Sequence, residues 1–205
     1  MFDNLTVEEF LNKVSSNDPV PGGGSVSALA GSLAASLAAM VASLTIGKKK
    51  YIEVEEEMKE IKEQALKLKE KLYEDIKKDS ESFEEVMKAF KLPKATDEEK
   101  VHRKNVIEDA TKKAALVPFD AAKTACEVIS LAEKVIEKGN KNAVTDGAVA
   151  AMLARTAVFG ALYNTKINLG GIEDSVFVED LKEKVISLEK EALEKEKVAL
   201  SKVIL

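Results

Sequence analysis

One carboxylate lies where a helix would present an apolar side chain. Between about Ile52 and Phe90, apolar residues recur at spacings of three and four, and the same stepping from Ile76 to Phe83 reaches Asp79. Burial raises the pKa of a carboxyl group and a nearby cation lowers it, and this balance suits a general acid or base. The alternative is a structural ion pair with a lysine or with Arg103, which lies one step before the next apolar stripe.

A second candidate is the glycine-rich turn Pro21-Gly22-Gly23-Gly24-Ser25, which leads directly into a helical pattern. Its backbone N–H groups would lie beside the positive end of a helix dipole, and its glycines allow a flat or anionic ligand to approach the backbone closely. A Walker loop is excluded, because Gly47-Lys48 lacks the upstream glycine and no strand precedes either motif. The alternative is a tight turn packed under a helical bundle.

For four further polar residues the sequence does not decide between a role in binding and a structural role. The pattern from about Ala143 to Ile167 places Asp146, Asn164 and Asn168 on one mostly small-residue face, where they either satisfy internal hydrogen bonds or contact a ligand. Lys48 begins a run of three lysines, either a solvated helix end or a contact for an anionic tail from the same or another subunit.

The elements that must position these candidates are helices. A capping box, Thr6 with Glu9, opens a short helix that ends near Val14. The segment after the glycine turn carries no charge up to Ile46 and is rich in Ala, Ser and Leu, and Gly47 ends it. A helix that is small and uncharged all round is expected to be wrapped on every side by neighbours.

The second half of the chain continues the helical pattern. Thr96 and Glu99 form another capping box, and Pro118 should kink the helix that follows and free the carbonyl of Ala114. After Gly170-Gly171 a last amphipathic helix has an apolar stripe at Leu181, Val185, Leu188, Ala192, Ala199 and Val203. We therefore predict one all-α domain over residues 1–205, an up-and-down bundle with two small-residue helices inside and long charged helices around them.

Assembly and location follow from composition. The face with Ala28, Ser32, Ala35 and Ala39, or its counterpart in the fifth helix, is predicted to pack against a second subunit as a homodimer. Net charge of −5 disfavours a nucleic-acid partner. The central helix is long enough for a membrane span, but Ala and Ser dominate it and the chain has no Trp, which favours a helix inside a soluble bundle.

The single histidine and the single cysteine limit the possible chemistry. His102 and Cys126 exclude a histidine cluster, a multi-cysteine metal site and an intrachain disulfide, so we expect no metal and treat both as structural. The acidic N-terminus lacks the apolar core of a signal peptide, and we expect a cytoplasmic protein.

An ordered set of motifs resembles a known family. The motifs are Pro21-Gly-Gly-Gly-Ser25, the Ala/Ser/Leu helix ending Gly47-Lys48-Lys49, Asp79-x-x-x-Phe83, Leu92-Pro93-Lys94, Val117-Pro118, Gly139-Asn140, Asp146, Val158-Phe159-Gly160-Ala161, Asn164 and Ile167-Asn168-Leu169. In this order they resemble the cyclodeaminase domain of formiminotransferase-cyclodeaminase and its free-standing bacterial relatives, the methenyltetrahydrofolate cyclohydrolases of the serine-cycle type. The likeness covers nearly the whole chain, which lacks the formiminotransferase half of the bifunctional enzymes.

The resemblance implies an all-helical dimer acting on a one-carbon unit held by tetrahydrofolate, with no other cofactor. It places the catalytic aspartate at Asp79 and the folate-site loop at Pro21 to Ser25. The glutamate tail of folate would favour cations such as Lys48 or Arg103, and the pterin edge would pair with Asp146 or Asn164. Hydrolysis of 5,10-methenyltetrahydrofolate and cyclodeamination of 5-formiminotetrahydrofolate both stay open, and the alternative from another class is a non-catalytic helical dimerisation scaffold.

Overall fold

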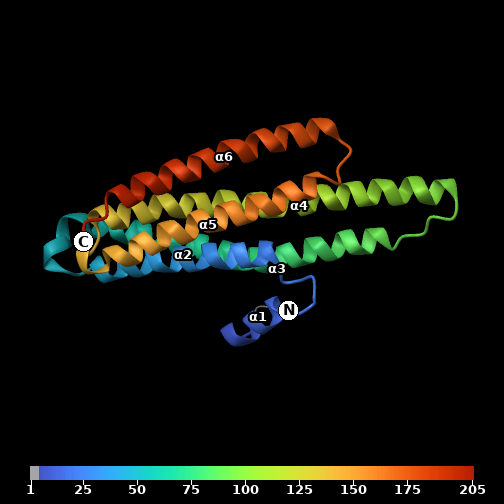
Figure 1. The fold of residues 1–205 in the computed structure, drawn as a ribbon. Helices are drawn as coiled ribbons and strands as arrows, with labels where there is room; N and C mark the ends of the chain where they lie inside the picture. Colours follow the sequence, from blue (N-terminus) through green and yellow to red (C-terminus); the bar gives the residue numbers. More distant parts are fainter. Residues whose placement is uncertain (1–4) are drawn as a thin grey trace.

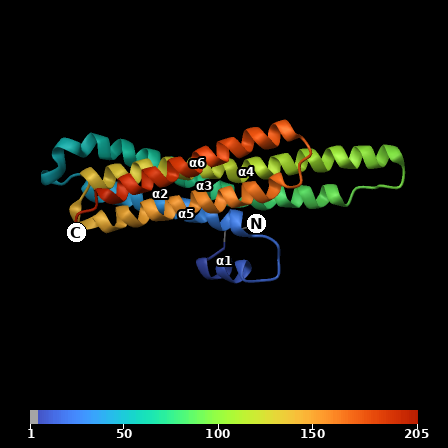
Figure 2. The ribbon, with the colours of Figure 1, turned by 45° about the horizontal axis from the view of Figure 1, so that its top comes forward.

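The computed structural model describes residues 5–205, which form helices and no strand. The elements are α1 (Val7–Val14), α2 (Gly23–Thr45), the 3-10 helix η2 (Lys49–Val54), α3 (Glu55–Phe90), α4 (Asp97–Lys138), the 3-10 helix η3 (Lys141–Ala143), α5 (Val144–Leu169) and α6 (Ser175–Ser201). Helices α2 to α5 run side by side, α6 lies along α4 and α5, and α1 sits apart on one side (Figures 1 and 2). The predicted all-α architecture is confirmed.

The predicted helix ends are largely confirmed. Both capping boxes form: Glu9 N–H donates to Thr6 Oγ1 at 3.2 Å, and Glu99 N–H donates to Thr96 Oγ1 at 3.1 Å. Gly47 has a φ of +76°, a left-handed conformation that follows the end of α2 and suits glycine. The helix expected from about Ile52 begins at Glu55, because η2 occupies the preceding residues.

Small residues let the central helices approach closely. A Cβ on Gly160 of α5 would lie 2.2 Å from Ser27 Oγ of α2, and a Cβ on Gly31 of α2 would lie 3.1 Å from Leu72. The core around these contacts is built largely from alanines of α2, α4 and α5, such as Ala34, Ala122 and Ala154. The backbones are therefore held together by dispersion over many short contacts.

Two expectations about α2 are wrong for the single chain. Ala28, Ser32, Ala35 and Ala39, predicted to face a second subunit, are buried in the chain's own core, because α3 and α5 pack against them. Nor is α2 wrapped on every side. One face stays exposed, and it carries the larger apolar residues Val26, Leu33, Met40 and Leu44. The small residues thus face inward, where close approach matters, and the large ones face outward.

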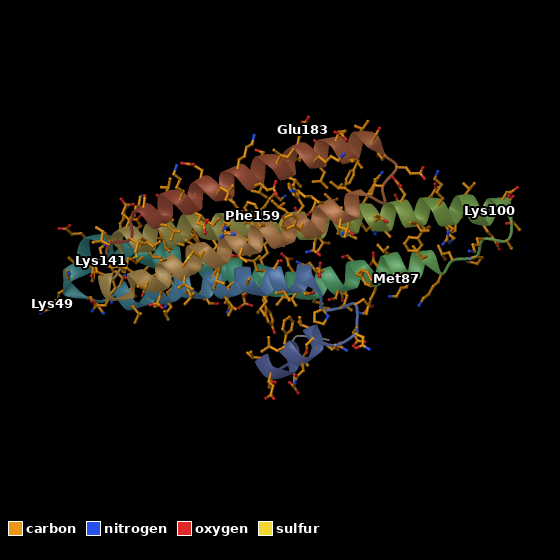
Figure 3. The ribbon with its side chains drawn as sticks, in the orientation of Figure 1. Lys49, Met87, Lys100, Lys141, Phe159 and Glu183 are labelled. Atoms are coloured by element: carbon orange, nitrogen blue, oxygen red, sulfur yellow. The ribbon has the colours of Figure 1, made fainter. Side chains whose placement is uncertain are left out.

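The apolar stripe of α3 is buried only over part of its length. Met58, Ile61 and Leu72 are buried, whereas Phe83 and Phe90 are exposed. The α3–α4 hairpin extends beyond the other helices, as Met87 and Lys100 mark in Figure 3, so that α4 alone lies beside α3 there. Packing of α2 against the apolar stripe of α3 ends near Asp79, because α2 begins there.

Helices α2 and α5 are long and apolar enough to cross a membrane by length and composition alone. In the bundle, however, 61% of the apolar window in α2 and 50% of that in α5 are buried against the rest of the chain. This burial is typical of core helices in a soluble protein, so the two helices are weak evidence for a membrane span.

Candidate functional site

A cavity of about 380 Å³ opens where α2 begins, between the glycine-rich turn and helices α3, α4 and α5. Its walls are Pro19, Val20, Gly22, Gly23, Gly24, Asp79, Ser82, Phe83, Val86, Ala114, Asn164, Ile167 and Asn168. Of the predicted site residues, the fold brings together Asp79, three glycines and Asn164. Pro21 and Ser25 are buried and are not among the lining residues.

Asp79 is held by Ser25, at the start of α2. The Ser25 hydroxyl donates to Asp79 Oδ2 at 2.9 Å and is itself fully buried, 3.2 Å from both the Ser80 hydroxyl and the Ile76 carbonyl. Burial raises the pKa of Asp79 above its usual value, while the hydroxyl and the backbone N–H of Ser25 act in the opposite direction. No lysine or arginine in residues 5–205 forms an ion pair with Asp79, so the predicted alternative of a structural ion pair is not seen. The nearby buried carboxylate that does form a salt bridge is Asp75, which contacts Lys78 at 2.9 Å.

The glycine turn is shaped around the Asp79 carboxylate. A Cβ on Gly24 would lie 2.0 Å from Asp79 Oδ1 and 2.5 Å from its Cγ, so that only glycine allows the carboxylate to sit against the helix. A Cβ on Gly23 would lie 3.2 Å from Asn164 Nδ2, a tight but less severe contact. The glycines therefore have a geometric role beyond forming a turn.

Asp79 also supplies the negative charge that the start of α2 lacks. The N-cap of α2 is Gly22, without a side-chain cap, and its first turn contains no acidic residue. The Asp79 carboxylate from α3 lies at this positive helix end, where a negative charge is stabilised. An anionic ligand group placed there would be repelled by Asp79, so of the two ligand types predicted for the glycine turn the anionic one is disfavoured.

Two asparagine amides of α5 complete the polar wall. Asn164 Nδ2 donates to the Gly160 carbonyl at 2.9 Å, and Asn168 Nδ2 donates to the Ala114 carbonyl of α4 at 2.7 Å. Because both acceptors are carbonyl oxygens, each amide donates one of its two N–H groups to the protein and keeps Oδ1 as an acceptor. Asp79 is the one charged residue among the described lining residues. The cavity thus offers acceptors and a negative charge to a ligand that carries N–H groups or a positive charge.

The other predicted binding residues lie elsewhere in the single chain. Arg103 donates to the Phe90 carbonyl at 3.0 Å on the α3–α4 extension, about 16 Å along α3 from Asp79. Lys48 follows α2 at the opposite end of the bundle, about 35 Å along the helix from the glycine turn. Lys49, its neighbour, marks that end in Figure 3. Asp146 lies at the same end, because Asn140, just before α5, donates to the Leu44 carbonyl at 3.1 Å. Their binding roles stay predictions.

Several lining residues were not among the predicted site residues. Phe83 is four residues after Asp79, so helical spacing from Asp79 could have found it. Asn168, four residues after Asn164, also lines the cavity; the sequence left it open between a ligand contact and an internal hydrogen bond. Ile167 and Ala114 carry no such signal, because apolar residues at these spacings are ordinary in a helical protein.

Other features of the molecule offer less chemistry. A smaller cavity of about 180 Å³ under α1 is lined by Leu5, Thr6, Val7, Phe10, Leu11, Leu29, Tyr73 and Ile76, without a carboxylate. Burial raises the pKa of the Cys126 thiol to about 11, which keeps it protonated and unreactive. Within residues 5–205 no cluster of three His, Cys, Asp or Glu side chains could hold a metal ion.

Comparison with known proteins places the chain among folate enzymes. Methenyltetrahydrofolate cyclohydrolase from Methylorubrum extorquens is 42% identical over 180 residues, which cover 88% of this chain and 86% of that protein. Formimidoyltransferase-cyclodeaminase from Rattus norvegicus is 30% identical over 189 residues, and this chain matches 35% of the length of the rat protein.

A solved structure and a family model agree with these relatives. Formiminotetrahydrofolate cyclodeaminase from Thermotoga maritima superposes with a TM-score of 0.89 at 33% identity, covering 99% of this chain and 98% of that one. The family model for formiminotransferase-cyclodeaminase matches residues 6–187. The chain belongs to the formiminotransferase-cyclodeaminase family of folate one-carbon enzymes.

Proposed function

We propose that this protein hydrolyses 5,10-methenyltetrahydrofolate, with Asp79 as the acid–base group. The observation that carries the proposal is a partly buried carboxylate, free of any ion pair in the described chain, in the wall of a cavity of about 380 Å³. The 42% identity to a methenyltetrahydrofolate cyclohydrolase over most of both chains supports this choice of substrate.

The negative charge of Asp79 in the cavity is complementary to the positive charge of the methenyl group. The carbon of that group bridges N5 and N10 of the folate as an amidinium cation. Asp79 and the Oδ1 atoms of Asn164 and Asn168 present only acceptors to it, and no lysine or arginine is among the lining residues described. A cationic one-carbon unit is therefore stabilised in this cavity without a competing positive charge.

One carboxylate can serve both proton transfers. Ionised Asp79 removes a proton from a water molecule as its oxygen bonds to the methenyl carbon, which gives a neutral tetrahedral adduct. Protonated Asp79 then delivers that proton to N5 as the C–N5 bond breaks, and the remaining hydroxyl proton of the adduct leaves to solvent. The product is 10-formyltetrahydrofolate, and one proton is released overall. A pKa raised by burial favours both steps, because the group must accept and return a proton near neutral pH.

A second candidate reaction is cyclodeamination of 5-formiminotetrahydrofolate, favoured by the superposition on the Thermotoga maritima cyclodeaminase. N10 bonds to the formimino carbon and gives its proton to Asp79. Asp79 returns the proton to the amino group, which leaves as ammonia. The protonated formimino group is again an amidinium cation, so the same acceptors would hold it. No cofactor beyond the folate is part of either reaction.

The proposal includes a homodimer formed through the exposed face of α2. Val26, Leu33, Met40 and Leu44 are between 38% and 51% exposed, and α2 contains no charged residue. Val149 and Met152 of the adjacent α5, both 41% exposed, extend the apolar surface. A surface of this kind is typical of an interface between subunits. We also propose that the enzyme is cytoplasmic and has no nucleic-acid or membrane partner. The net charge of −5 and the Ala- and Ser-rich composition of α2 support this.

A single absorbance assay tests the function. Methenyltetrahydrofolate absorbance is followed with the purified protein and either substrate supplied, and ammonia is measured in parallel. We expect absorbance to fall with 5,10-methenyltetrahydrofolate. A rise with 5-formiminotetrahydrofolate, together with ammonia, assigns the second reaction instead. If neither substrate turns over and folate fails to raise the melting temperature, the alternative of a non-catalytic scaffold replaces the proposal.

A further inference from the structure

The middle of α4 contains an unpaired backbone acceptor. Pro118 is buried within this continuous helix and has no N–H. The carbonyl of Ala114, four residues earlier, therefore lacks its usual helical donor. Ala114 lines the cavity, whereas Pro118 is not among the lining residues.

Asn168 of α5 supplies the missing donor. Its Nδ2 lies 2.7 Å from the Ala114 carbonyl oxygen, a contact between helices 54 positions apart in sequence. A carbonyl oxygen can only accept, so the nitrogen of the amide must face it and Oδ1 must face away. Because of the proline, the Ala114 carbonyl is free to accept a hydrogen bond from Asn168. That hydrogen bond fixes the orientation of the Asn168 amide in the cavity wall.

Asn164, one turn earlier on α5, is a natural comparison. Its Nδ2 donates to the Gly160 carbonyl, which belongs to its own helix. Asn164 is therefore held without any help from α4. The two amides line the same cavity but differ in their dependence on Pro118.

We propose that Asn168 is a substrate-binding residue whose Oδ1 accepts an N–H of the pteridine ring, and that Pro118 is a positioning residue that acts on substrate binding through Asn168. This inference rests on the proposed folate function. Pro118 need not touch the substrate, because its effect is to leave the Ala114 carbonyl available. Replacing it with alanine restores an N–H that competes with Asn168 for that carbonyl.

The test uses two double-mutant cycles. Binding of 5-formyltetrahydrofolate, a stable folate, is measured by calorimetry for Pro118→Ala, Asn168→Ala, Asn164→Ala and the pairs Pro118→Ala/Asn168→Ala and Pro118→Ala/Asn164→Ala. Loss of one neutral hydrogen bond weakens binding roughly three- to tenfold, and we expect this for Asn168→Ala and a similar or smaller effect for Pro118→Ala. The pair with Asn168→Ala should bind no more weakly than Asn168→Ala alone, whereas the pair with Asn164→Ala should show additive losses.

Kinetics and stability separate this role from a merely structural one. KM for methenyltetrahydrofolate should rise while kcat changes little, because the contact is made in both the bound substrate and the transition state. Alanine is the better helix residue at an interior position, so Pro118→Ala should melt no lower than the parent. Pro118→Ala alone carries the test if Asn168→Ala fails to fold.

Two results overturn the inference while the parent protein still binds and turns over folate. One is parent-like binding by Pro118→Ala. The other is an additive loss in the pair with Asn168→Ala. Failure of the proposed function looks different, because the parent itself then neither binds 5-formyltetrahydrofolate nor turns over either substrate.

Discussion

Adding one methyl group at Gly24 should disable the enzyme without unfolding it. The Cβ of Gly24→Ala would lie 2.0 Å from Asp79 Oδ1, whereas ordinary contact begins near 3.4 Å, so the carboxylate must shift by about 1.4 Å. The carboxylate is part of a short side chain held by Ser25, and moving it stretches or breaks the 2.9 Å hydrogen bond to that hydroxyl. The position of the acid–base group is therefore changed directly.

The expected loss is large for so small a substitution. A misplacement of about 1 Å can cost on the order of a hundredfold in rate, which corresponds to about 2.7 kcal/mol of barrier. The helix itself should tolerate the change, because alanine is favoured over glycine in helices by up to about 1 kcal/mol.

The assay compares kcat and melting temperature of Gly24→Ala with those of Gly23→Ala. The Cβ of the control would lie 3.2 Å from Asn164 Nδ2, which can yield by a few tenths of an ångström, so we expect a modest rise in KM and a nearly unchanged kcat. A Gly24→Ala protein that is folded and within threefold of the parent kcat would refute the claim that this glycine exists to admit Asp79.

Two further predictions concern the pKa of Asp79 and the assembly. Ser25→Ala removes a hydrogen-bond donor that lowers the pKa of Asp79, so the pKa of Asp79 should rise further. The acid limb of the pH–rate profile should then move to higher pH. An acid limb that does not move contradicts the role given to Ser25. Leu33→Glu places a charge on the exposed face of α2 and should give a folded monomer in sedimentation analysis. Leu193→Glu, at a similarly exposed apolar position of α6, is the matched control and should stay dimeric. A Leu33→Glu protein that is still a dimer of parent stability removes this face as the interface.

Much of the fold could be predicted because local signals decide it. Thr6 and Thr96 specify helix starts through capping, and Gly47 follows the end of α2 because it can adopt a positive φ. The direction of the α2 faces could not be predicted. Small residues such as Ala35 fit equally well inside a chain or between subunits, and only the packing against α3 and α5 decides between them.

The candidate site was predictable where a residue contradicts its own helix pattern. Asp79 interrupts an apolar stripe, so it was detectable from spacing. Asn168 was a candidate because it shares a helix face with Asn164, but its hydrogen-bond partner was not predictable. The sequence predicts that Pro118 frees the Ala114 carbonyl and does not say which side chain reaches it. Arg103 also continues an apolar stripe, yet it bonds to Phe90 on the extension. The same kind of signal thus marked one residue in the cavity and one outside it.

The most direct test of the central claim is the initial rate and melting temperature of Asp79→Asn, measured on one preparation. Asparagine keeps the size of the side chain but cannot exchange a proton at neutral pH. The raised pKa of Asp79 means that its contribution to stability is present at low pH and is lost as pH rises through that pKa. At neutral pH the variant should therefore melt no lower than the parent, while its rate falls by roughly a hundredfold to ten-thousandfold. A folded Asp79→Asn protein that turns over methenyltetrahydrofolate within about threefold of the parent would contradict the account.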